Sequence, residues 1–593
     1  MFSGGAAVEN IGYGRAVSLH PPFREAAEAW LAEDPDAKTA AELRSLIERA
    51  DKRDEAALRE LREAFDGQLE FGTAGLRGLL GAGPQRMNRV LMRKVTAGLA
   101  AYLREHVPDA GSRGVVIGHD ARHNSRIFAE DTARVLAGAG IMVYLAHRPW
   151  PTPTTAWAVT ELRCAAGVMV TASHNPPAYN GYKVYWGNGA QIVPPHDKGI
   201  AEAIAREEKR GRSDQLPMPN LAEARAKGLV VDLDENLHDK YLAAVVALRE
   251  QPTLDGAGLI IAYTPLHGVG AASVEPALER AGFPRVHTEF AQRHPDPDFP
   301  TVSFPNPEEK GAMDRVLELA RRSNAELVLA NDPDADRLCV AVPDDGSYRV
   351  LTGDQVGALL ADYLLTVGHK GKRMVATTIV SSQLLSFLAQ QVGADYRETL
   401  TGFKWIGNAA MDYEKQVGGR FVMGYEEALG YSVGPLVRDK DGVSACVIFA
   451  ELVVWNRARG KTVLDHLDDI YRRVGLFVTE QVSITKPGSE GLAEIRAAMT
   501  RFRGKPPTEI SGFAVEQVVD LSKGEGGLPP SDVLVFKLAG GRRIIMRPSG
   551  TEPKLKSYYE VRVPVGSGEP IADARTRGLA ELAKLRDAHQ AMI

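Results

Sequence analysis

The sequence predicts an α/β protein of several domains that ends in a part of a different, α+β type. Short apolar runs such as GVVIGHD and GLIIAYTP alternate with helical segments, which is the pattern of buried, largely parallel strands joined by helices. The chain of 593 residues is too long for one core and predicts about three to five domains. Near its end, a predicted β-hairpin replaces the alternation.

The N-terminal part begins with helices. Apolar residues recur at helical spacing over residues 22–65, and a long helix is expected at VLMRKVTAGLAAYLREH. The glycine-rich segment EFGTAGLRGLLGAG separates them. After them we expect a strand at GVVIGHD, a helix around FAEDTARVLAGAG and a strand at IMVYLA. These elements make up one α/β unit.

The same alternation recurs further along the chain. GLIIAYTP predicts a strand, VEPALERAGF a helix, and AELVLANDPDADR a strand that runs into a polar loop; RMVATTIV and GRFVMGYEEA repeat the design. The tail predicts a hairpin that turns at Gly540–Gly541, followed by a strand at SYYEVRVPV. We expect boundaries in polar or Gly/Pro-rich stretches near 220, 345 and 475, which gives domains 1–220, 221–345, 346–475 and 476–593.

The composition argues against several classes of function. Hydrophobic residues make up 44% and charged residues 25%, as in soluble globular proteins, and the net charge of −5 gives no support to nucleic-acid or membrane-surface binding. The three scattered cysteines form no zinc or disulfide pattern, and buried thiols in a reducing cytoplasm are the simpler reading. No signal peptide or membrane-spanning run is visible, so we expect a cytoplasmic protein.

One polar loop carries a candidate nucleophile. The apolar strand before it delivers Ser173, His174 and Asn175 into a loop held by two prolines. Ser173 could be a nucleophile or carry a phosphoryl group. His174 is its neighbour in an extended chain and points the other way, so the two do not begin a Ser-His-Asp triad. Taken alone, this loop could also be an ordinary turn.

A second loop offers a candidate metal site. Asp332, Asp334 and Asp336 alternate, so an extended segment would put their carboxylates on one face, where three hard oxygens suit Mg²⁺. The spacing does not fit an EF-hand, because Arg337 stands where that loop needs glycine and Pro343 where it needs glutamate. An acidic turn without metal is the alternative.

Two further loops offer contacts for a sugar and for a phosphate. In GYEEALG, the carboxylate of Glu426 could accept hydrogen bonds from sugar hydroxyls, although the loop could also be merely solvated. In RPSGTEP, Arg547 offers a bidentate fork, Ser549 and Thr551 offer hydroxyls, and Gly550 lets backbone N–H groups approach an anion. The loops GTAGLRG, GHDARHNS and TLTGFKW, with Arg77, Arg122 and Lys404, are weak signals alone.

Together these motifs resemble the α-D-phosphohexomutase family of phosphoglucomutases, phosphomannomutases and their relatives. GTAGLRG, TASHNP, DPDADR, GYEEALG and RPSGTEP occur in the family's order and cover nearly the whole chain past residue 70. The sequence looks most similar to the branch that includes phosphopentomutase-like members. The resemblance implies three similar α/β domains with mixed sheets and a smaller C-terminal α+β domain around one central cleft.

The resemblance also implies roles for individual residues. Ser173 would carry the phosphoryl group, and the three aspartates would hold Mg²⁺ together with an oxygen of the phosphoserine. A sugar bisphosphate would activate the enzyme, and phosphorylated sugars would be its substrates. The implied catalytic residues are Ser173, Lys183, Lys440, Arg77 and His174. The implied substrate-binding residues are Arg337, Thr401, Gly402, Lys404, Glu426, Arg547, Ser549, Gly550 and Thr551.

The function expected from the resemblance is the interconversion of a sugar 1-phosphate and a sugar 6-phosphate, with glucose as the first candidate for the sugar. Phosphopentomutase or phosphomannomutase activity is an alternative, because many relatives have Glu-x-Ser in the sugar loop while this chain has Ala428. A phosphatase would need no second phosphate site, and a non-catalytic sensor could lose the serine or the metal ligands, none of which is missing. The sequence leaves the oligomeric state open.

Overall fold

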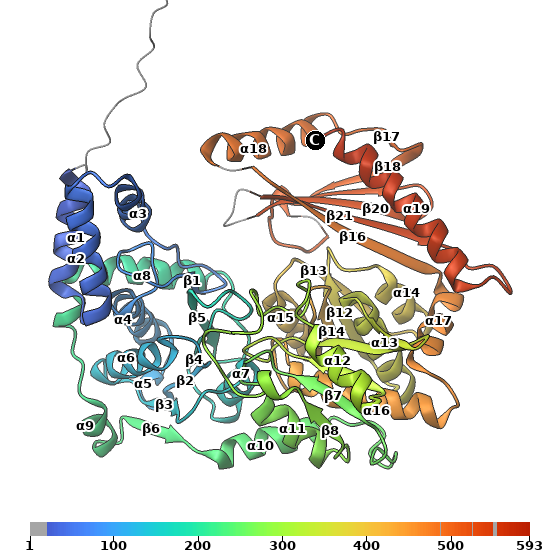
Figure 1. The fold of residues 1–593 in the computed structure, drawn as a ribbon, viewed down its shortest axis with the longest axis horizontal. Helices are drawn as coiled ribbons and strands as arrows, with labels where there is room; N and C mark the ends of the chain where they lie inside the picture. Colours follow the sequence, from blue (N-terminus) through green and yellow to red (C-terminus); the bar gives the residue numbers. More distant parts are fainter. Residues whose placement is uncertain (1–20, 487, 525, 550–553) are drawn as a thin grey trace, which may run out of the picture.

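The computed structural model describes residues 21–486, 488–524, 526–549 and 554–593 and arranges them around four β-sheets (Figure 1). Each of the first three sheets combines parallel pairs with antiparallel ones, and the fourth is antiparallel throughout its described pairs. The architecture is therefore three similar α/β domains followed by a C-terminal α+β domain, as the sequence predicts.

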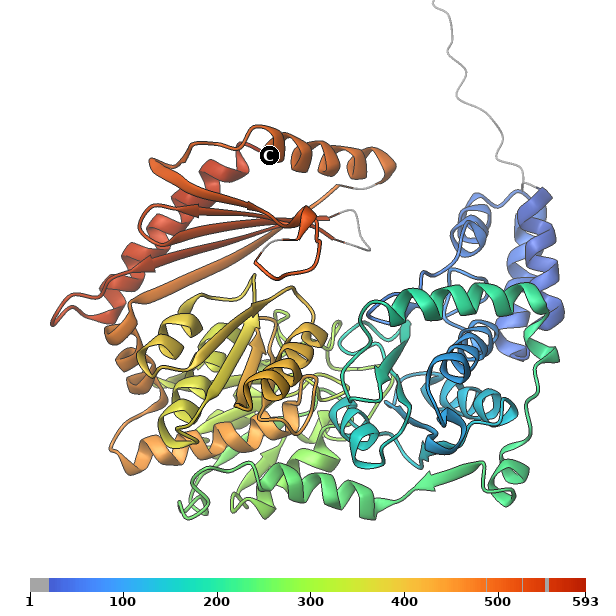
Figure 2. The ribbon, with the colours of Figure 1, turned by 180° about the vertical axis from the view of Figure 1, so that it is seen from behind.

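The helices expected over residues 22–65 form a small bundle on one side of the first domain (Figures 1 and 2). Asp36 and Asp54 accept backbone hydrogen bonds at the starts of the second and third helices, which satisfies N–H groups that have no partner within the helix. Their apolar faces bury Leu43, Leu61 and Phe65 in one cluster that reaches Val90 of the long helix behind them. The three helices are α1(Pro21–Glu33), α2(Ala37–Asp51) and α3(Glu55–Phe65).

The first sheet has the strand order β1-β5-β4-β2-β3-β6. The strand before the serine loop, β4, is buried along its whole length, so its carboxyl end brings that loop to the edge of the sheet. The strands are β1(Leu76–Leu79), β2(Val115–His119), β3(Val143–Ala146), β4(Ala166–Val170), β5(Tyr179–Trp186) and β6(Val230–Leu233). The helices are α4(Arg89–His106), α5(Ala110–Arg113), α6(Ser125–Gly138), α7(Thr152–Glu161), α8(His196–Arg210) and α9(Leu221–Ala226), with a short 3₁₀ turn η1(Ser213–Gln215).

The second sheet has the order β11-β10-β9-β7-β8. Its strand β9 runs directly into the aspartate loop. Its strands are β7(Ile261–Thr264), β8(Val286–Thr288), β9(Leu327–Ala330), β10(Cys339–Asp344) and β11(Ser347–Val350). Its helical segments are α10(Glu235–Val246), α11(Ala271–Arg280), η2(Phe290–Gln292) and α12(Asp314–Ser323).

The third sheet has the order β13-β12-β14-β15. It consists of β12(Arg373–Thr378), β13(Asp395–Thr399), β14(Arg420–Glu426) and β15(Gly430–Val433). The helices that accompany it are α13(Gly353–Val367), α14(Leu384–Gln391), α15(Phe403–Val417), α16(Gly442–Ala458) and α17(Val463–Val474).

The fourth sheet lies beside the third in both views (Figures 1 and 2) and has the order β16-β21-β20-β19-β18-β17. The hairpin expected at Gly540–Gly541 is confirmed, since both glycines have positive φ and Leu538 pairs with Arg542. The strands are β16(Leu476–Thr485), β17(Glu509–Ile510), β18(Phe513–Asp520), β19(Leu534–Leu538), β20(Arg542–Pro548) and β21(Lys554–Val563). The helical segments are α18(Gly488–Gly504), η3(Leu521–Lys523) and α19(Ile571–Gln590).

Two strands lie beyond boundaries expected from the sequence. β6 belongs to the first sheet but follows residue 220, and β11 pairs with β10 but follows residue 345. We therefore propose that the first domain continues through β6 and the second through β11, while the last boundary stays near residue 475. Among the described residues, no helix is long and apolar enough to cross a membrane.

Candidate active site

The serine loop begins directly after β4. Ser173 is buried, and its Oγ donates a hydrogen bond to Asp332 Oδ2 at 2.8 Å, so the loop of the first domain meets the aspartate loop of the second. His174 Nδ1 lies 3.3 Å from the same Oγ. Burial and then the nearby charges of Arg337 and Arg77 hold the pKa of His174 well below its usual value, so its imidazole is neutral.

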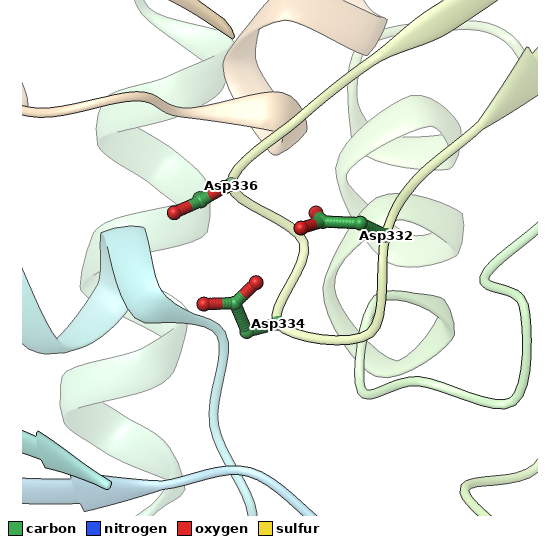
Figure 3. A group of neighbouring side chains, drawn as sticks. All are labelled: Asp332, Asp334 and Asp336. Atoms are coloured by element: carbon green, nitrogen blue, oxygen red, sulfur yellow. The ribbon is translucent and has the colours of Figure 1, made fainter. Parts of the chain in front are cut away.

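The three aspartates converge, but by a different route from the one the sequence predicts. The segment is a turn rather than an extended strand, and Ala335 within it has a left-handed φ of 55°. Figure 3 shows the side chains of Asp332, Asp334 and Asp336 turned toward a common space. One oxygen from each carboxylate lies within 4.8 Å of the others, and all three residues are fully buried.

These carboxylates fit a divalent cation. Asp334 Oδ1 and Asp336 Oδ1 are buried and have no hydrogen-bond partner among the described residues. A buried carboxylate oxygen that accepts no hydrogen bond is unfavourable, and hard carboxylate oxygens are the ligands that Mg²⁺ prefers. Burial and then the adjacent carboxylates raise the pKa of Asp332 well above its usual value, because both disfavour its negative charge. The triad can therefore bind a metal.

Two lysines from different domains face this charge. Lys183 on β5 donates to Asp334 Oδ2 at 2.8 Å and to Asp336 Oδ2 at 3.0 Å. Lys440 Nζ lies 3.2 Å from Asp336 Oδ2 and 3.1 Å from Asp439 Oδ1. Burial opposes the charge on both lysines, but the carboxylates outweigh it and raise their pKa, so both side chains are ammonium ions.

Two arginines complete the positive lining. Arg337 Nε lies 3.9 Å from Asp332 Oδ2 and 4.0 Å from Asp336 Oδ1, and Nη1 lies 3.7 Å from Glu308. Arg77 on β1 is exposed, and its Nη1 donates to Asn175 Oδ1 at 2.9 Å. Both guanidinium groups thus lie beside the serine and aspartate loops.

The sugar-loop candidates are clustered in the third domain. Gly402 N donates to Glu426 Oε1 at 2.7 Å, which ties the TLTGFKW loop to the end of β14. Burial lowers the pKa of Lys404, and the nearby Glu426 partly offsets this effect. Burial likewise raises the pKa of Glu426, while Lys440 acts against the rise. Glu426 therefore stands between the sugar loop and the lysine at the aspartates.

The phosphate-cradle candidates lie at the end of β20. Arg547 Nη1 donates to Thr401 Oγ1, so the fourth domain contacts the sugar loop of the third. Ser549 N donates to Lys554 O at 2.8 Å, which closes the base of the loop. Gly550 and Thr551 lie outside the described residues. The structure thus brings Arg547 and Thr401 together, while the contacts of the loop tip are not described.

Several residues at the site were not assigned a role from the sequence. Thr152, at the start of α7, donates to Asp334 Oδ2 at 2.6 Å. Asp439 accepts hydrogen bonds from Tyr185 and Gln191 of the first domain and from the backbone and side chain of Lys440. The position of Asp439 beside Lys440 in RDKDG was the available signal, whereas no sequence signal points to Thr152.

Chemically, the arrangement combines a buried hydroxyl, a cation-compatible carboxylate turn and two ammonium groups within one region. Such a set can stabilise charge on a phosphoryl group and move a proton to or from an attacking or departing oxygen. Arg547 supplies a separate positive group from another domain.

Four family models match the chain in order. They are described as phosphoglucomutase/phosphomannomutase alpha/beta/alpha domain I over residues 68–211, domain II over 239–346, domain III over 352–474, and the C-terminal domain over 492–576. Together they span well over half of the sequence and leave the bundle α1–α3 outside the matched ranges.

The names of individual relatives refer to three different sugars. A Haemophilus influenzae protein named "Probable phosphomannomutase" is 43% identical over 80% of this chain and 93% of its own length. The phosphopentomutase of Homo sapiens is 36% identical over 95% of both chains, and a Staphylococcus aureus phosphoglucomutase is 35% identical over 85% of this chain and 92% of its own. The solved structure of the Paramecium phosphoglucomutase pp63/parafusin, 17% identical, matches the fold with a TM-score of 0.67 over 88% of this chain and 96% of that one.

Proposed function

Because the chain belongs to the phosphoglucomutase/phosphomannomutase family, whose members are isomerases, we propose that it interconverts sugar 1-phosphates and sugar 6-phosphates through a phosphorylated Ser173. The observation that supports this most directly is the hydrogen bond from Ser173 Oγ to Asp332, which puts a buried hydroxyl at the carboxylate turn. The reaction needs no net phosphate release, since each phosphoryl group given to the sugar is replaced by one returned to the serine.

In the first half of the proposed cycle, a hydroxyl of the sugar phosphate attacks the phosphorus of phosphorylated Ser173. The bond from phosphorus to Oγ breaks, a bond to the sugar oxygen forms, and the proton of the hydroxyl passes to a base. The resulting bisphosphate turns over within the site and returns its other phosphoryl group to Ser173. Phosphoryl transfer asks the protein mainly for alignment and charge stabilisation, which fits a site crowded with fixed charges.

We assign the proton transfers to Lys183 and Lys440. Both are ammonium ions beside the carboxylates, so one of them can protonate the departing oxygen, which is Ser173 Oγ in the first step and the sugar oxygen in the return step. The lysine that has given up this proton then takes the proton of the attacking hydroxyl, so that each half-reaction ends with the lysine protonated again. His174, neutral and 3.3 Å from Ser173 Oγ, can accept a hydrogen bond or a proton there. Arg77 and Arg337 would contact the transferring phosphoryl group.

We propose that Asp332, Asp334 and Asp336 hold Mg²⁺, with an oxygen of phosphorylated Ser173 as a further ligand. When bound, the cation would neutralise charge on the phosphoryl group. The aspartates themselves keep the turn in place through Thr152 and Lys183, so the ligand positions are set by the protein.

The second phosphate of the substrate would bind in the cradle of Arg547, Ser549, Gly550 and Thr551. This separate site supports a mutase over a phosphatase. A mutase must bind the bisphosphate by either of its two phosphates, whereas hydrolysis of a phosphoserine needs no second phosphate-binding site. Glu426, Thr401, Gly402 and Lys404 would contact the sugar between the two phosphates.

Glucose phosphates are the proposed substrates, with pentose phosphates as the second candidate. The pentose reading is supported by relatives named phosphopentomutase and by Ala428, which offers no hydroxyl to the sugar. Mannose phosphates remain an alternative through relatives named phosphomannomutase. We also propose a cytoplasmic location and no nucleic-acid partner.

The decisive experiment measures both products and the enzyme itself. The dephosphorylated protein should gain one phosphoryl group at Ser173, seen by peptide mass spectrometry, when it is incubated with a sugar 1,6- or 1,5-bisphosphate and Mg²⁺. It should then convert sugar 1-phosphates in a panel of hexoses and pentoses. Steady release of inorganic phosphate as the main product would favour the phosphatase instead.

A further inference from the structure

We propose that Asp120, Arg122 and Thr171 form a clamp that holds the backbone of Ser173 in the conformation required for phosphoryl transfer. The inference rests on the proposed role of Ser173 as phosphoryl carrier. None of the three side chains hydrogen-bonds to Ser173 Oγ, so they are positioning residues rather than catalytic ones.

The backbone of Ser173 needs such support. Its φ is +51°, in the left-handed region that residues with a Cβ avoid because the Cβ approaches a backbone oxygen. A residue keeps this conformation only where its surroundings enforce it, and such positions are concentrated at functional sites. The conformation is the one in which Oγ points to Asp332.

The N–H group of Ser173 is held from one side. It donates to Thr171 Oγ1 at 2.8 Å, and Thr171 Oγ1 in turn donates to Asp120 Oδ2 at 2.7 Å. Because the hydroxyl proton goes to Asp120, the hydroxyl's lone pairs remain available to the amide of Ser173. Asp120 is fixed by a second hydroxyl, that of Ser125, at 2.6 Å.

The carbonyl group of Ser173 is held from the other side by Arg122. Nη2 donates to Ser173 O and to Asn175 O, both at 2.5 Å, and Nη1 donates to Pro176 O at 2.9 Å. Its Nε lies 3.2 Å from Asp120 Oδ2, so the same carboxylate orients both halves of the clamp. One rigid guanidinium thereby fixes three carbonyls of the serine loop, which a lysine ammonium could not match in geometry.

The second domain closes the clamp. The centroid of the Phe299 ring lies 4.9 Å from the Arg122 guanidinium carbon, and Asp298 accepts a hydrogen bond from the adjacent His123 at 2.7 Å. The side chains of Asp120 and Arg122 are each only 1% exposed. The clamp is therefore built into the junction between the domain that carries Ser173 and the domain that carries the aspartates, where alignment of the two loops matters most.

The test compares Thr171→Val, which removes the hydroxyl but keeps the shape, with Thr171→Ser, which restores it. The readout is the single-turnover rate at which a labelled glucose 1,6-bisphosphate phosphorylates Ser173 in the presence of Mg²⁺. We expect Thr171→Val to slow this transfer by about 100-fold, the loss that a small misalignment causes, with KM for the sugar phosphate changed by less than about two-fold. Thr171→Ser should recover most of the rate.

Thr132→Val is the matched control, since Thr132 is also fully buried in the first domain but contacts Thr96 instead of the serine loop. It should transfer at the wild-type rate. Arg122→Lys, which keeps the charge but not the fork, supplies a second variant should Thr171→Val fail to fold, and we expect it to slow transfer by at least about ten-fold.

The outcomes separate the clamp from the function on which it rests. Wild-type protein that never acquires label at Ser173 would overturn the phosphoserine mechanism itself. Wild-type protein that is labelled, together with a folded Thr171→Val or Arg122→Lys variant labelled just as fast, would overturn the clamp alone. A loss that appears in KM and not in the transfer rate would also contradict it.

Discussion

The two ends of the proposed site are held very differently. Ser173 and the three aspartates are buried, and the serine loop is tied down through its side chain, its N–H group and its carbonyl. Arg547, at the opposite end, is half-buried near the C-terminal end of β20 and reaches across a domain junction to Thr401. At the end with Ser173 and the aspartates, the distances between the functional groups are fixed by hydrogen bonds. At the end with Arg547, the position of the side chain depends on how the third and fourth domains contact each other.

The difference matches what each end would have to do. Phosphoryl transfer is sensitive to small displacements, so the serine and the carboxylates must not move relative to each other. A bisphosphate that turns over must leave the cradle and bind it again in the opposite orientation, so the cradle has to grip phosphate without fixing the sugar. Changes at the first end should therefore lower kcat, and changes at the second should raise KM.

Ser173→Ala tests the rigid end most directly. Without the hydroxyl there is no phosphoryl acceptor, and we expect kcat to fall by about 10⁴-fold or more, as happens when other covalent enzymes lose their nucleophile. Steady-state conversion of glucose 1-phosphate measures the loss, and mass spectrometry should find no phosphoryl group on that peptide. Retention of substantial turnover would mean that another residue carries the phosphoryl group.

Asp334→Asn should have the next largest effect. The amide keeps the shape but loses a charge at the carboxylate turn, and we expect kcat to fall by about 10²- to 10³-fold with a higher Mg²⁺ requirement. Asp345→Asn is a matched control, because Asp345 lies in an exposed turn of the same domain with a left-handed φ that asparagine tolerates. Full activity of Asp334→Asn in a chelator would contradict a metal role for the triad.

Arg547→Met tests the cradle. A hydrogen bond to a charged group contributes about 1.5–3 kcal/mol, so kcat/KM should fall by roughly ten- to 150-fold, mainly through KM. Arg577→Met in the same domain should change little, since Arg577 forms an exposed ion pair with Glu569. The comparison between the two ends would fail if Arg547→Met lowered kcat and left KM unchanged.

The junction that carries the cradle domain should respond to pH through Asp354. This buried carboxyl accepts hydrogen bonds from Ser382 N at 2.7 Å and from Thr479 Oγ1, on the first strand of the fourth domain, at 3.3 Å; burial raises its pKa to about 7. In the unfolded chain an aspartate carboxyl ionises near pH 3.9. The contribution of neutral Asp354 to the free energy of unfolding is therefore fully present below that pH and is lost as the pH rises through about 7.

Asp354→Asn should remove this pH dependence. Three pKa units correspond to about 4 kcal/mol, but an amide nitrogen cannot accept the hydrogen bond from Thr479, so we expect a gain of about 1–2 kcal/mol at pH 8 and no gain at pH 4. Thermal unfolding of both proteins across this range measures the difference. An identical pH dependence in the two proteins would exclude Asp354 as its source.

The sequence was most informative where local rules decide the structure. The hairpin at Gly540–Gly541 and the helix α4 follow from turn chemistry and periodicity. The aspartates were expected to meet along an extended segment, whereas a turn with Ala335 in the left-handed region brings them together, and alternation alone does not encode such a turn.

Contacts between distant backbone and side-chain atoms could not be foreseen in this way. The grip of Arg122 on the carbonyls of Ser173 and Asn175 joins segments about fifty residues apart and leaves no mark in composition or spacing. The same holds for Thr152 and Asp334, which come from different domains. Motif resemblance located the loops, and the structure supplies what holds them.

The smallest expected effect concerns the sugar between the two ends. Ala428 lies in the turn after β14, at the position where the family's sugar-loop motif, as the resemblance implies it, often has a serine. We therefore expect the chain to discriminate only modestly among sugars and to bind chiefly through phosphate. Ala428→Ser adds one hydroxyl, and a hydrogen bond to a neutral partner contributes about 0.5–1.5 kcal/mol. The substitution should therefore shift the ratios of kcat/KM by roughly two- to thirteen-fold. The substrates to compare are the 1-phosphates of glucose, mannose, ribose and deoxyribose. Because residue 428 belongs to neither the serine loop nor the cradle segment, the rate of Ser173 phosphorylation by a bisphosphate should stay within about two-fold of wild type. Sharp wild-type selectivity for one hexose that Ala428→Ser leaves unchanged would place sugar recognition in another loop, with TLTGFKW the first to examine because Gly402 already bonds Glu426.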